Sequence, residues 1–177
     1  MSRASKTVAL LGDTHGHLDD RVAAVATACD MVVHTGDVGG DSILETLAAE
    51  GARIIAVAGN NDTPLHWAGD EARRLPQLPA EAMVDLPGGT LVVVHGHRLR
   101  ARDRHARLRR AHPEATAVVY GHSHRLALDT ESVPWVLNPG AAGRSRTYGG
   151  PACVVLECTD RRWALHAHRF TPPPKRR

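Results

Sequence analysis

The sequence has few cysteines and no long apolar run, and each shortage excludes a class of protein. Its three cysteines, Cys29, Cys153 and Cys158, are odd in number and lack metal-type spacing. This argues against a disulfide framework and favours a reducing compartment. No stretch approaches the ~18 apolar residues of a membrane-spanning helix, and the N-terminus lacks the layout of a secretory signal. We therefore expect a cytoplasmic protein without a membrane segment.

Aromatic residues are also scarce, at 3% of 177 residues, so the core must be built from valine, leucine, isoleucine and alanine. The hydrophobic content of 42% is enough for one globular domain with a sizeable core. We expect this domain over residues 1–170, followed by a disordered basic tail at 171–177. The formal net charge is only +3, so the composition does not require a nucleic-acid partner.

The first third of the chain alternates short apolar runs with segments of helical periodicity. Buried strands are predicted at 6–11, at 31–34 and within 53–62. Amphipathic helices are predicted at 18–29 and after residue 41, the second with Asp41 or Ser42 as N-cap and Gly51 as terminator. This alternation predicts a parallel sheet with helices packed on it.

The rest of the chain mixes several patterns. Residues 63–79 predict one short helix and a loop, and 82–97 predict two strands joined by a Gly-Gly turn. An arginine-rich helix is predicted over 101–112. It should end before Pro113, because proline does not fit inside a helix. A buried strand is expected within 116–124, and the short apolar runs from there to residue 170 favour antiparallel strands.

Polar side chains follow five of the apolar strands, in the segments "GDTHGH", "HTGD", "AGNND", "VHGH" and "YGHSH". The carboxyl ends of parallel strands share one edge of a sheet, where such folds bind ligands. Asp13 and His15 are two residues apart, as are His122 and His124, so each pair would point its side chains the same way if the backbone is extended. All the residues delivered there suit divalent metals, and none is a thiol; they are Asp13, His15, Asp37, Asn60, His95, His122 and His124.

The other histidines are interpreted as caps or as solvated loop residues, because a lone histidine after a strand usually has one of these roles. They are His34, His66, His105, His112, His166 and His168.

The ordered set D-x-H, G-D, G-N-x-D, H-G-H and G-H-x-H resembles the calcineurin-like metallophosphoesterases. It is most similar to their small bacterial and archaeal phosphodiesterase branch. The resemblance runs from Asp13 to His124, and "NPGA" at 138–141 also resembles that branch. It implies an α/β fold, a four-layer α/β/β/α sandwich with two mixed β-sheets and a dinuclear metal site at the carboxyl ends of the strands.

The resemblance also implies roles for the strand-end residues. Asp13, His15 and His124 would hold one metal ion, and Asn60, His95 and His122 would hold the other. Asp37 would bridge the two, and a hydroxide between them would attack phosphorus in line with the leaving oxygen. Two divalent ions are implied as cofactors, with Mn favoured and Fe, Ni, Co or Zn also compatible with these ligands. The residues expected to act in catalysis are Asp37, Asn60, His95 and His97.

The sequence departs from the wider family at Asn61. Many members read G-N-H-D/E there, and that histidine is thought to protonate the leaving group. Asparagine cannot act as a general acid, and such help contributes ~10²–10⁴ in rate. We therefore expect phosphodiesters, or esters with acidic leaving groups, to be cleaved in preference to alkyl monoesters. His97 either substitutes as a proton donor, orients a ligand or contacts phosphate.

Three functions remain open from the sequence. The first is a metal-dependent phosphodiesterase acting on a small-molecule phosphate ester, with a phosphomonoesterase as a variant. The second is a non-catalytic protein-interaction scaffold of the same fold, like the small subunit of retromer. The third is a nucleic-acid-binding protein or nuclease that uses the arginine-rich segment between Arg98 and Arg110. Nucleic acid is not favoured, because the segment lacks interleaved aromatic residues and helix-surface arginines are usually solvated.

Overall fold

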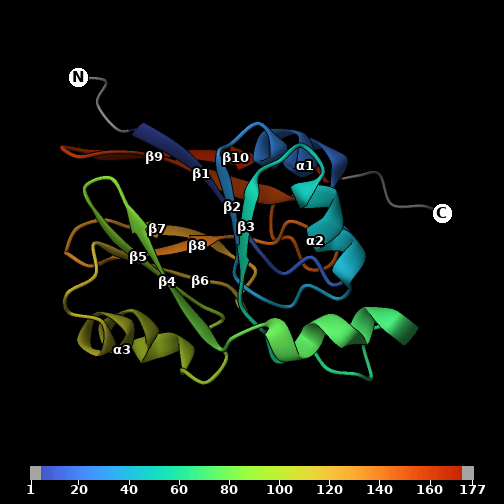
Figure 1. The fold of residues 1–177 in the computed structure, drawn as a ribbon. Helices are drawn as coiled ribbons and strands as arrows, with labels where there is room; N and C mark the ends of the chain where they lie inside the picture. Colours follow the sequence, from blue (N-terminus) through green and yellow to red (C-terminus); the bar gives the residue numbers. More distant parts are fainter. Residues whose placement is uncertain (1–4, 173–177) are drawn as a thin grey trace.

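The computed structural model describes residues 5–172 and arranges them as two five-stranded sheets packed face to face (Figure 1). The strands of the first sheet, in the order β10-β9-β1-β2-β3, are Trp163–Arg169, Ala152–Thr159, Ser5–Leu11, Met31–His34 and Arg53–Ala56. Those of the second, in the order β4-β5-β6-β8-β7, are Glu81–Leu86, Gly89–Val94, Ala117–Tyr120, Trp135–Pro139 and Leu126–Asp129.

Both sheets are mixed. In the first, β1, β2 and β3 are parallel, and β9 pairs antiparallel with β1 and β10. In the second, β5, β6 and β8 are parallel, while β4 and β7 pair antiparallel at the two edges. All four residues of β2 and all four of β6 are buried, which explains their continuous apolar runs, because parallel strands are covered on both faces.

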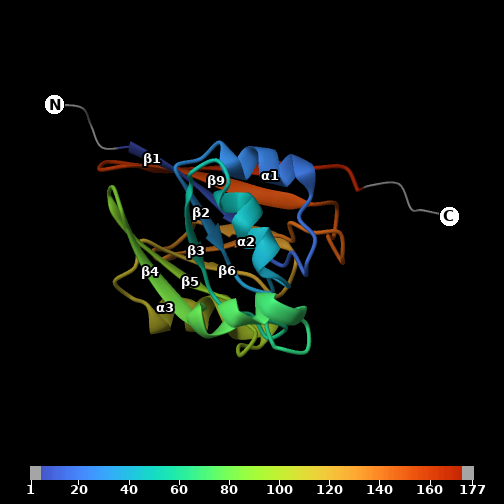
Figure 2. The ribbon, with the colours of Figure 1, turned by 45° about the vertical axis from the view of Figure 1, so that its right-hand side comes forward.

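Helices cover the outer face of each sheet. The helices α1 (Asp20–Thr27) and α2 (Asp41–Ala48) pack against the first sheet, and α3 (Arg104–Ala111) packs against the second (Figure 2). Two 3₁₀ segments, η1 (Gly69–Gln77) and η2 (Ala101–Asp103), precede β4 and α3 respectively. The order of layers is therefore α/β/β/α, and the predicted sandwich of two mixed sheets is confirmed.

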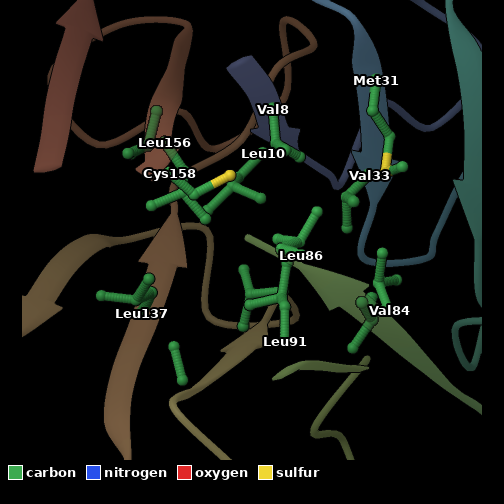
Figure 3. Close-up of a cluster of buried hydrophobic side chains, with 14 of the residues drawn as sticks. Val8, Leu10, Met31, Val33, Val84, Leu86, Leu91, Leu137, Leu156 and Cys158 are labelled. Carbon is green, nitrogen blue, oxygen red and sulfur yellow. The ribbon is translucent and has the colours of Figure 1, made fainter. Parts of the chain in front are cut away.

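The main apolar core lies between the two sheets (Figure 3). Val8, Leu10 and Val33 of the first sheet face Leu91 and Leu137 of the second, and all five side chains are fully buried. Complete burial of such a side chain stabilises the fold by ~1.5–3 kcal/mol. As expected from the shortage of aromatic residues, branched aliphatic side chains fill this interface and hold the two sheets together.

The helix boundaries differ from the predictions for local physical reasons. Helix α1 begins after Asp19, whose Oδ1 accepts a hydrogen bond of 3.0 Å from the Arg21 backbone N–H. Helix α2 has Gly40 as its N-cap, so the prediction of Asp41 or Ser42 is wrong. The Ser42 backbone N–H instead donates to Glu71 Oε1 of η1, at 3.4 Å. A side chain distant in the sequence thus takes the place of a local cap.

The predicted helix over 101–112 is divided between η2 and α3, and α3 ends at Ala111. No helix within residues 5–172 has both the length and the apolar character needed to cross a membrane. The basic tail expected at 171–177 falls mostly on residues 173–177, which lie outside the described residues. The domain boundary at residue 170 stays a prediction.

Candidate metal centre

The loops that follow five strands meet at one end of the sandwich. Those after β1, β2 and β3 come from the first sheet, and those after β5 and β6 come from the second. The sequence pattern predicts the polar residues along the edge of a single parallel sheet. The structure instead brings them together from both sheets, so the candidate site lies where the carboxyl ends of the two sheets converge.

One group of side chains combines Asp13, His15 and His124, whose ligand atoms all lie within 4.8 Å of one another. His15 Nε2 is 3.2 Å from His124 Nε2, and His124 Nε2 is 3.6 Å from Asp13 Oδ1. Three such atoms facing a common point form a suitable pocket for one divalent cation. These are the residues that the resemblance assigned to one ion.

A second group combines Asp13, Asp37 and His95, all of them buried. The Asn60 Oδ1 atom lies 3.2 Å from His95 Nε2, which adds an amide oxygen to this group. The His122 ring centroid is 5.4 Å from that of His95. The structure therefore brings all the predicted ligands into one cluster, and Asp13 belongs to both groups.

Asp37 lies between the two groups. Its Oδ2 atom is 3.7 Å from His15 Nε2 and 3.4 Å from His95 Nε2. The Asn61 backbone N–H donates to Asp37 Oδ1 and the Asn61 side-chain amide donates to Oδ2, both at 2.8 Å. A Cβ atom at Gly59 would collide with this carboxylate, so glycine there permits the close approach of the two loops.

Backbone carbonyls orient two of the histidine rings. His95 Nδ1 lies 2.8 Å from the Thr35 carbonyl oxygen, and His124 Nδ1 lies 3.1 Å from the Ser145 carbonyl oxygen. Because a carbonyl can only accept, each Nδ1 carries the proton and each Nε2 directs its lone pair into the cluster. A hydrogen bond of this type to the outer ring nitrogen is typical of metal-binding histidines.

The electrostatics of the cluster favour a bound cation. Burial raises the pKa of Asp13 to about 7, and Asp13 Oδ2 has no hydrogen-bond partner among residues 5–172. Burial opposes charge on His95 too, but the Asp37 carboxylate raises the pKa of His95 above its usual value. Asp37 is also buried, yet His95 and the Asn61 amides lower its pKa. The donors present thus fit divalent metal ions, which would supply the positive charge that protons otherwise provide.

The remaining histidines of the cluster favour the neutral form, in which a ring nitrogen can bind a metal. Burial lowers the pKa of His124 to about 4. It also lowers the pKa values of His15, His97 and His122.

Several of these residues have a left-handed backbone, which the sequence argument did not foresee. The φ angles of Asp13, His15, Asp37, His122 and His124 lie between 49° and 66°. This conformation costs ~1–3 kcal/mol for a residue other than glycine and is concentrated at functional sites. The extended backbone assumed for the two-residue spacings is therefore wrong. As a result His124 joins Asp13 and His15, whereas His122 lies beside His95.

His34 is one of the supporting residues that sequence reasoning missed. It is fully buried, so its interpretation as a cap or solvated residue is wrong. Its Nδ1 accepts from the Gly36 N–H at 3.2 Å, which leaves Nε2 as the donor to Thr14 Oγ1 at 2.9 Å. The Thr14 hydroxyl in turn donates to the Val38 carbonyl at 2.8 Å. This series of hydrogen bonds joins the loops that carry Asp13 and Asp37. The apolar residues just before His34 were the sequence feature that could have indicated its burial.

Asp62 and Asn138 hold further loops in place. Asp62 accepts backbone hydrogen bonds from Val38, Gly39 and Gly59, at 2.9, 3.1 and 2.8 Å. The Asn138 amide donates to the Gly121 carbonyl at 2.9 Å and to Ser123 Oγ at 3.0 Å. Asn138 therefore fixes the loop that carries His122 and His124.

Two further polar side chains lie at the cluster. The guanidinium of Arg146 approaches His124, with Nη2 at 3.3 Å from Nε2. The His97 ring centroid lies 5.4 Å from that of His95 and 6.3 Å from that of His122. His97 Nδ1 is buried and has no hydrogen-bond partner within the described part of the chain. The composition of the 143–149 loop gave no signal for Arg146.

The arginine-rich segment is divided between structural and exposed side chains. Arg104 is buried, donates to the Leu99 carbonyl at 2.9 Å and lies over the Tyr120 ring. Arg109 Nη2 pairs with Asp129 Oδ1 at 2.6 Å. The arginines that remain exposed are Arg98, Arg100, Arg102, Arg107 and Arg110.

Comparison with known proteins agrees with this geometry. Residues 7–161 match the sequence profile of the calcineurin-like phosphoesterase superfamily domain. No curated protein sequence matches the chain.

Solved structures share the fold at low sequence identity. Vacuolar protein sorting 29 from Cryptosporidium parvum has a TM-score of 0.72 and 18% identity, and the match covers 94% of this chain and 98% of that one. An archaeal phosphodiesterase has a TM-score of 0.68 and 19% identity, with 92% and 99% covered. Zinc-bound Vps29 from Entamoeba histolytica has a TM-score of 0.64 and 18% identity, with 93% and 99% covered. Because the family profile spans most of the sequence, the chain belongs to the calcineurin-like phosphoesterase superfamily.

Proposed function

We propose that the protein is a phosphodiesterase that depends on two divalent metal ions and hydrolyses a small-molecule phosphate diester. The observation that carries this proposal is the convergence of the strand-end residues on one cluster with buried carboxylates at its centre, where Asp13 Oδ2 has no partner among residues 5–172. Membership of the phosphoesterase superfamily supports hydrolysis of a phosphate ester. The fold alone does not select it, because a sorting protein shares that fold.

Each predicted ligand keeps its proposed role. Asp13, His15 and His124 would hold one ion, and the other would be held by Asn60, His95 and His122. Asp37 would contact both, since its Oδ2 atom lies near His15 and His95. When bound, the ions would activate a water molecule and neutralise charge on the phosphate. Mn is the metal that we favour, with Fe, Ni, Co or Zn as alternatives.

The side chain of Asn61 supports a preference for diesters. Its amide donates to Asp37 Oδ2, so Asn61 orients the carboxylate and supplies no acidic proton. His97 would orient a ligand, because it lies beside His95 and His122. We also place the protein in the cytoplasm, and its three free cysteines are compatible with a reducing compartment.

The test is hydrolysis of an aryl phosphodiester by chelator-stripped protein, with and without added Mn²⁺, Zn²⁺, Co²⁺, Ni²⁺ or Fe²⁺. The proposal predicts that activity returns with metal and exceeds the activity on the matching aryl monoester. Asp37→Asn should lower the restored rate at least ~10²-fold, whereas the exposed carboxylate variant Asp85→Asn should leave it unchanged. A folded chain that stays inactive with every metal would contradict the proposal and favour a role in protein contacts.

A further inference from the structure

A cavity of about 280 Å³ lies beside the candidate metal centre. Two of its lining residues, His66 and Arg146, were not among the predicted site residues. The full set that lines it is His15, Asp37, Gly39, Asn61, His66 and Arg146. Because His15 belongs to one ligand group and Asp37 to the other, this cavity is where a phosphate ester at the metal centre would find room.

The loop that carries His66 is fixed at both ends. The Thr63 carbonyl accepts from the backbone N–H groups of His66 and Trp67, at 2.9 and 3.1 Å. The indole of Trp67 is buried and donates to Asp62 Oδ1 at 3.0 Å. Asp62 also binds the backbone of the loops that carry Asp37 and Asn60. The position of His66 relative to the ligands is therefore set by the framework of the site.

One ring nitrogen of His66 is engaged and the other is free. Nδ1 lies 2.9 Å from Thr63 Oγ1, an exposed contact that fixes the orientation of the ring. Nε2 has no protein partner among the residues that the structure describes. An imidazole held through one nitrogen at the wall of a cavity has the arrangement of a general acid, since its other nitrogen can pass a proton to a bound leaving group.

The other candidates for this role are less well placed. The Asn61 side chain is committed to Asp37 and has no acidic proton. His97 lines a different cavity, of about 220 Å³, between the loop after β5 and helix α3. The guanidinium of Arg146 presents a fork of N–H donors, which suits the charge of a phosphoryl oxygen and not the transfer of a proton to a leaving group.

We propose that His66 is the general acid that protonates the leaving group, a role that rests on the phosphodiesterase function proposed above. A water oxygen forms a bond to phosphorus as the bond from phosphorus to the leaving oxygen breaks. The electron pair of the broken bond stays on the leaving oxygen, which takes the proton from His66 Nε2. The products are an alcohol and a phosphate monoester, and the proton released by the attacking water restores the His66 imidazolium by way of solvent.

This assignment extends the substrate range expected from the sequence. An alkoxide is a poor leaving group and needs a proton, whereas 4-nitrophenolate leaves without one. His66 would therefore allow cleavage of diesters with alkyl leaving groups despite the loss of the family histidine at Asn61. The substrate class is then an alkyl phosphodiester.

The test compares two substrates on His66→Gln and on the wild type, both loaded with metal. On bis(2-hydroxyethyl) phosphate, which has an alkyl leaving group, the variant should lose ~10²-fold in kcat/KM. On bis(4-nitrophenyl) phosphate it should stay within about twofold of the wild type. The matched control is His166→Gln, which removes an exposed histidine on β10 and should change neither rate.

The outcomes separate the two proposals. Equal losses on both substrates, no loss on either, or a wild type that cleaves only the aryl diester would overturn the role of His66. A wild type that cleaves neither diester would overturn the phosphodiesterase function itself.

A second readout does not depend on turnover. When inorganic phosphate is added to the zinc-loaded protein, the ring proton signal of His66, identified by its loss in His66→Gln, should shift. The His166 signal should not. A His66 signal that stays fixed while phosphate shifts the signals of His15 or His124 would show that the phosphate site excludes His66.

Discussion

Asp13 illustrates at the scale of one residue why the cluster requires positive charge. Its carboxylate is fully buried, and one of its oxygens has no hydrogen-bond partner within residues 5–172. An isolated carboxylate in such a place takes up a proton, and burial accordingly raises the pKa of Asp13 to about 7. A divalent cation would replace that proton, so metal binding and proton release are coupled.

This coupling predicts that zinc affinity depends on pH. Below pH 7 the Asp13 carboxyl is mostly protonated in the metal-free protein, and the proton must leave when the ion binds. The affinity of the stripped protein for Zn²⁺ should therefore fall as the pH is lowered from 8 to 6, by about tenfold in total for this one carboxyl, with most of the loss below pH 7. Competition with a chelator of known affinity at several pH values measures this.

Two variants serve as references for the pH experiment. Asp13→Asn should bind Zn²⁺ far more weakly at every pH, because the shared carboxylate is gone. Asp85→Asn, at an exposed position on β4, should bind like the wild type. A zinc affinity of the wild type that does not change between pH 6 and pH 8 would contradict the protonation of Asp13.

At this scale the sequence identified the residues of the cluster better than the residues that hold them in place. Residues such as Asp37 and His95 were identified because acids, histidines and glycines follow five separate strands. The fold alone gives little reason for the same polar pattern to appear after each of them. Arg146 and His66 could not be found in this way, since they come from loops whose course depends on distant partners such as Asp62. His34 was misjudged because it is the last residue of β2, and the sequence does not tell a buried histidine at a strand end from a solvated one.

At the scale of elements, helix α3 is attached to the second sheet by polar as well as apolar contacts. Leu108 is buried on this sheet, and Arg109 donates to the Pro134 carbonyl at 3.0 Å and pairs with Asp129. His105 also bonds Asp129, through Nδ1 at 2.9 Å. Part of the arginine-rich segment thus holds the helix in place and is not free to bind a polyanion.

A pair of neighbouring arginines tests this attachment. Arg109→Ala should lower the free energy of unfolding by about 1–2 kcal/mol, since it removes charge-assisted hydrogen bonds to β7 and to the segment before β8. Arg110→Ala, at an exposed position, should cause no measurable change. Urea unfolding of the metal-free proteins measures both. Equal stabilities for the two variants would mean that Arg109 does not anchor the helix.

Helices and strands were predictable from the sequence where the residues of the segment itself determine its structure. Strands such as β1 and β6 follow from apolar runs that end at glycine. The N-cap of α2 was not predictable, because Glu71 from another segment binds its first turn. The left-handed loop residues were also hidden, since aspartate and histidine adopt that conformation only where the surrounding structure imposes it.

At the scale of the whole molecule, the site exists because two sheets end together. The order β10-β9-β1-β2-β3 returns the last strands of the chain to the first sheet, which composition and periodicity do not specify. Neither sheet alone supplies a complete set of ligands, because Asp13 and Asp37 come from one and His95 and His124 from the other. The apolar interface between the sheets therefore positions the candidate metal ligands as well as stabilising the fold.

The most direct test of a two-metal site counts ions and turnover in one sample. Stripped protein is titrated with Mn²⁺, and bound metal and hydrolysis of bis(4-nitrophenyl) phosphate are measured at each step. We predict that hydrolysis rises until about two ions are bound per chain, and that Asp37→Asn loses both the second ion and the activity. Full activity with a single ion bound, or an undiminished rate in Asp37→Asn, would contradict the account.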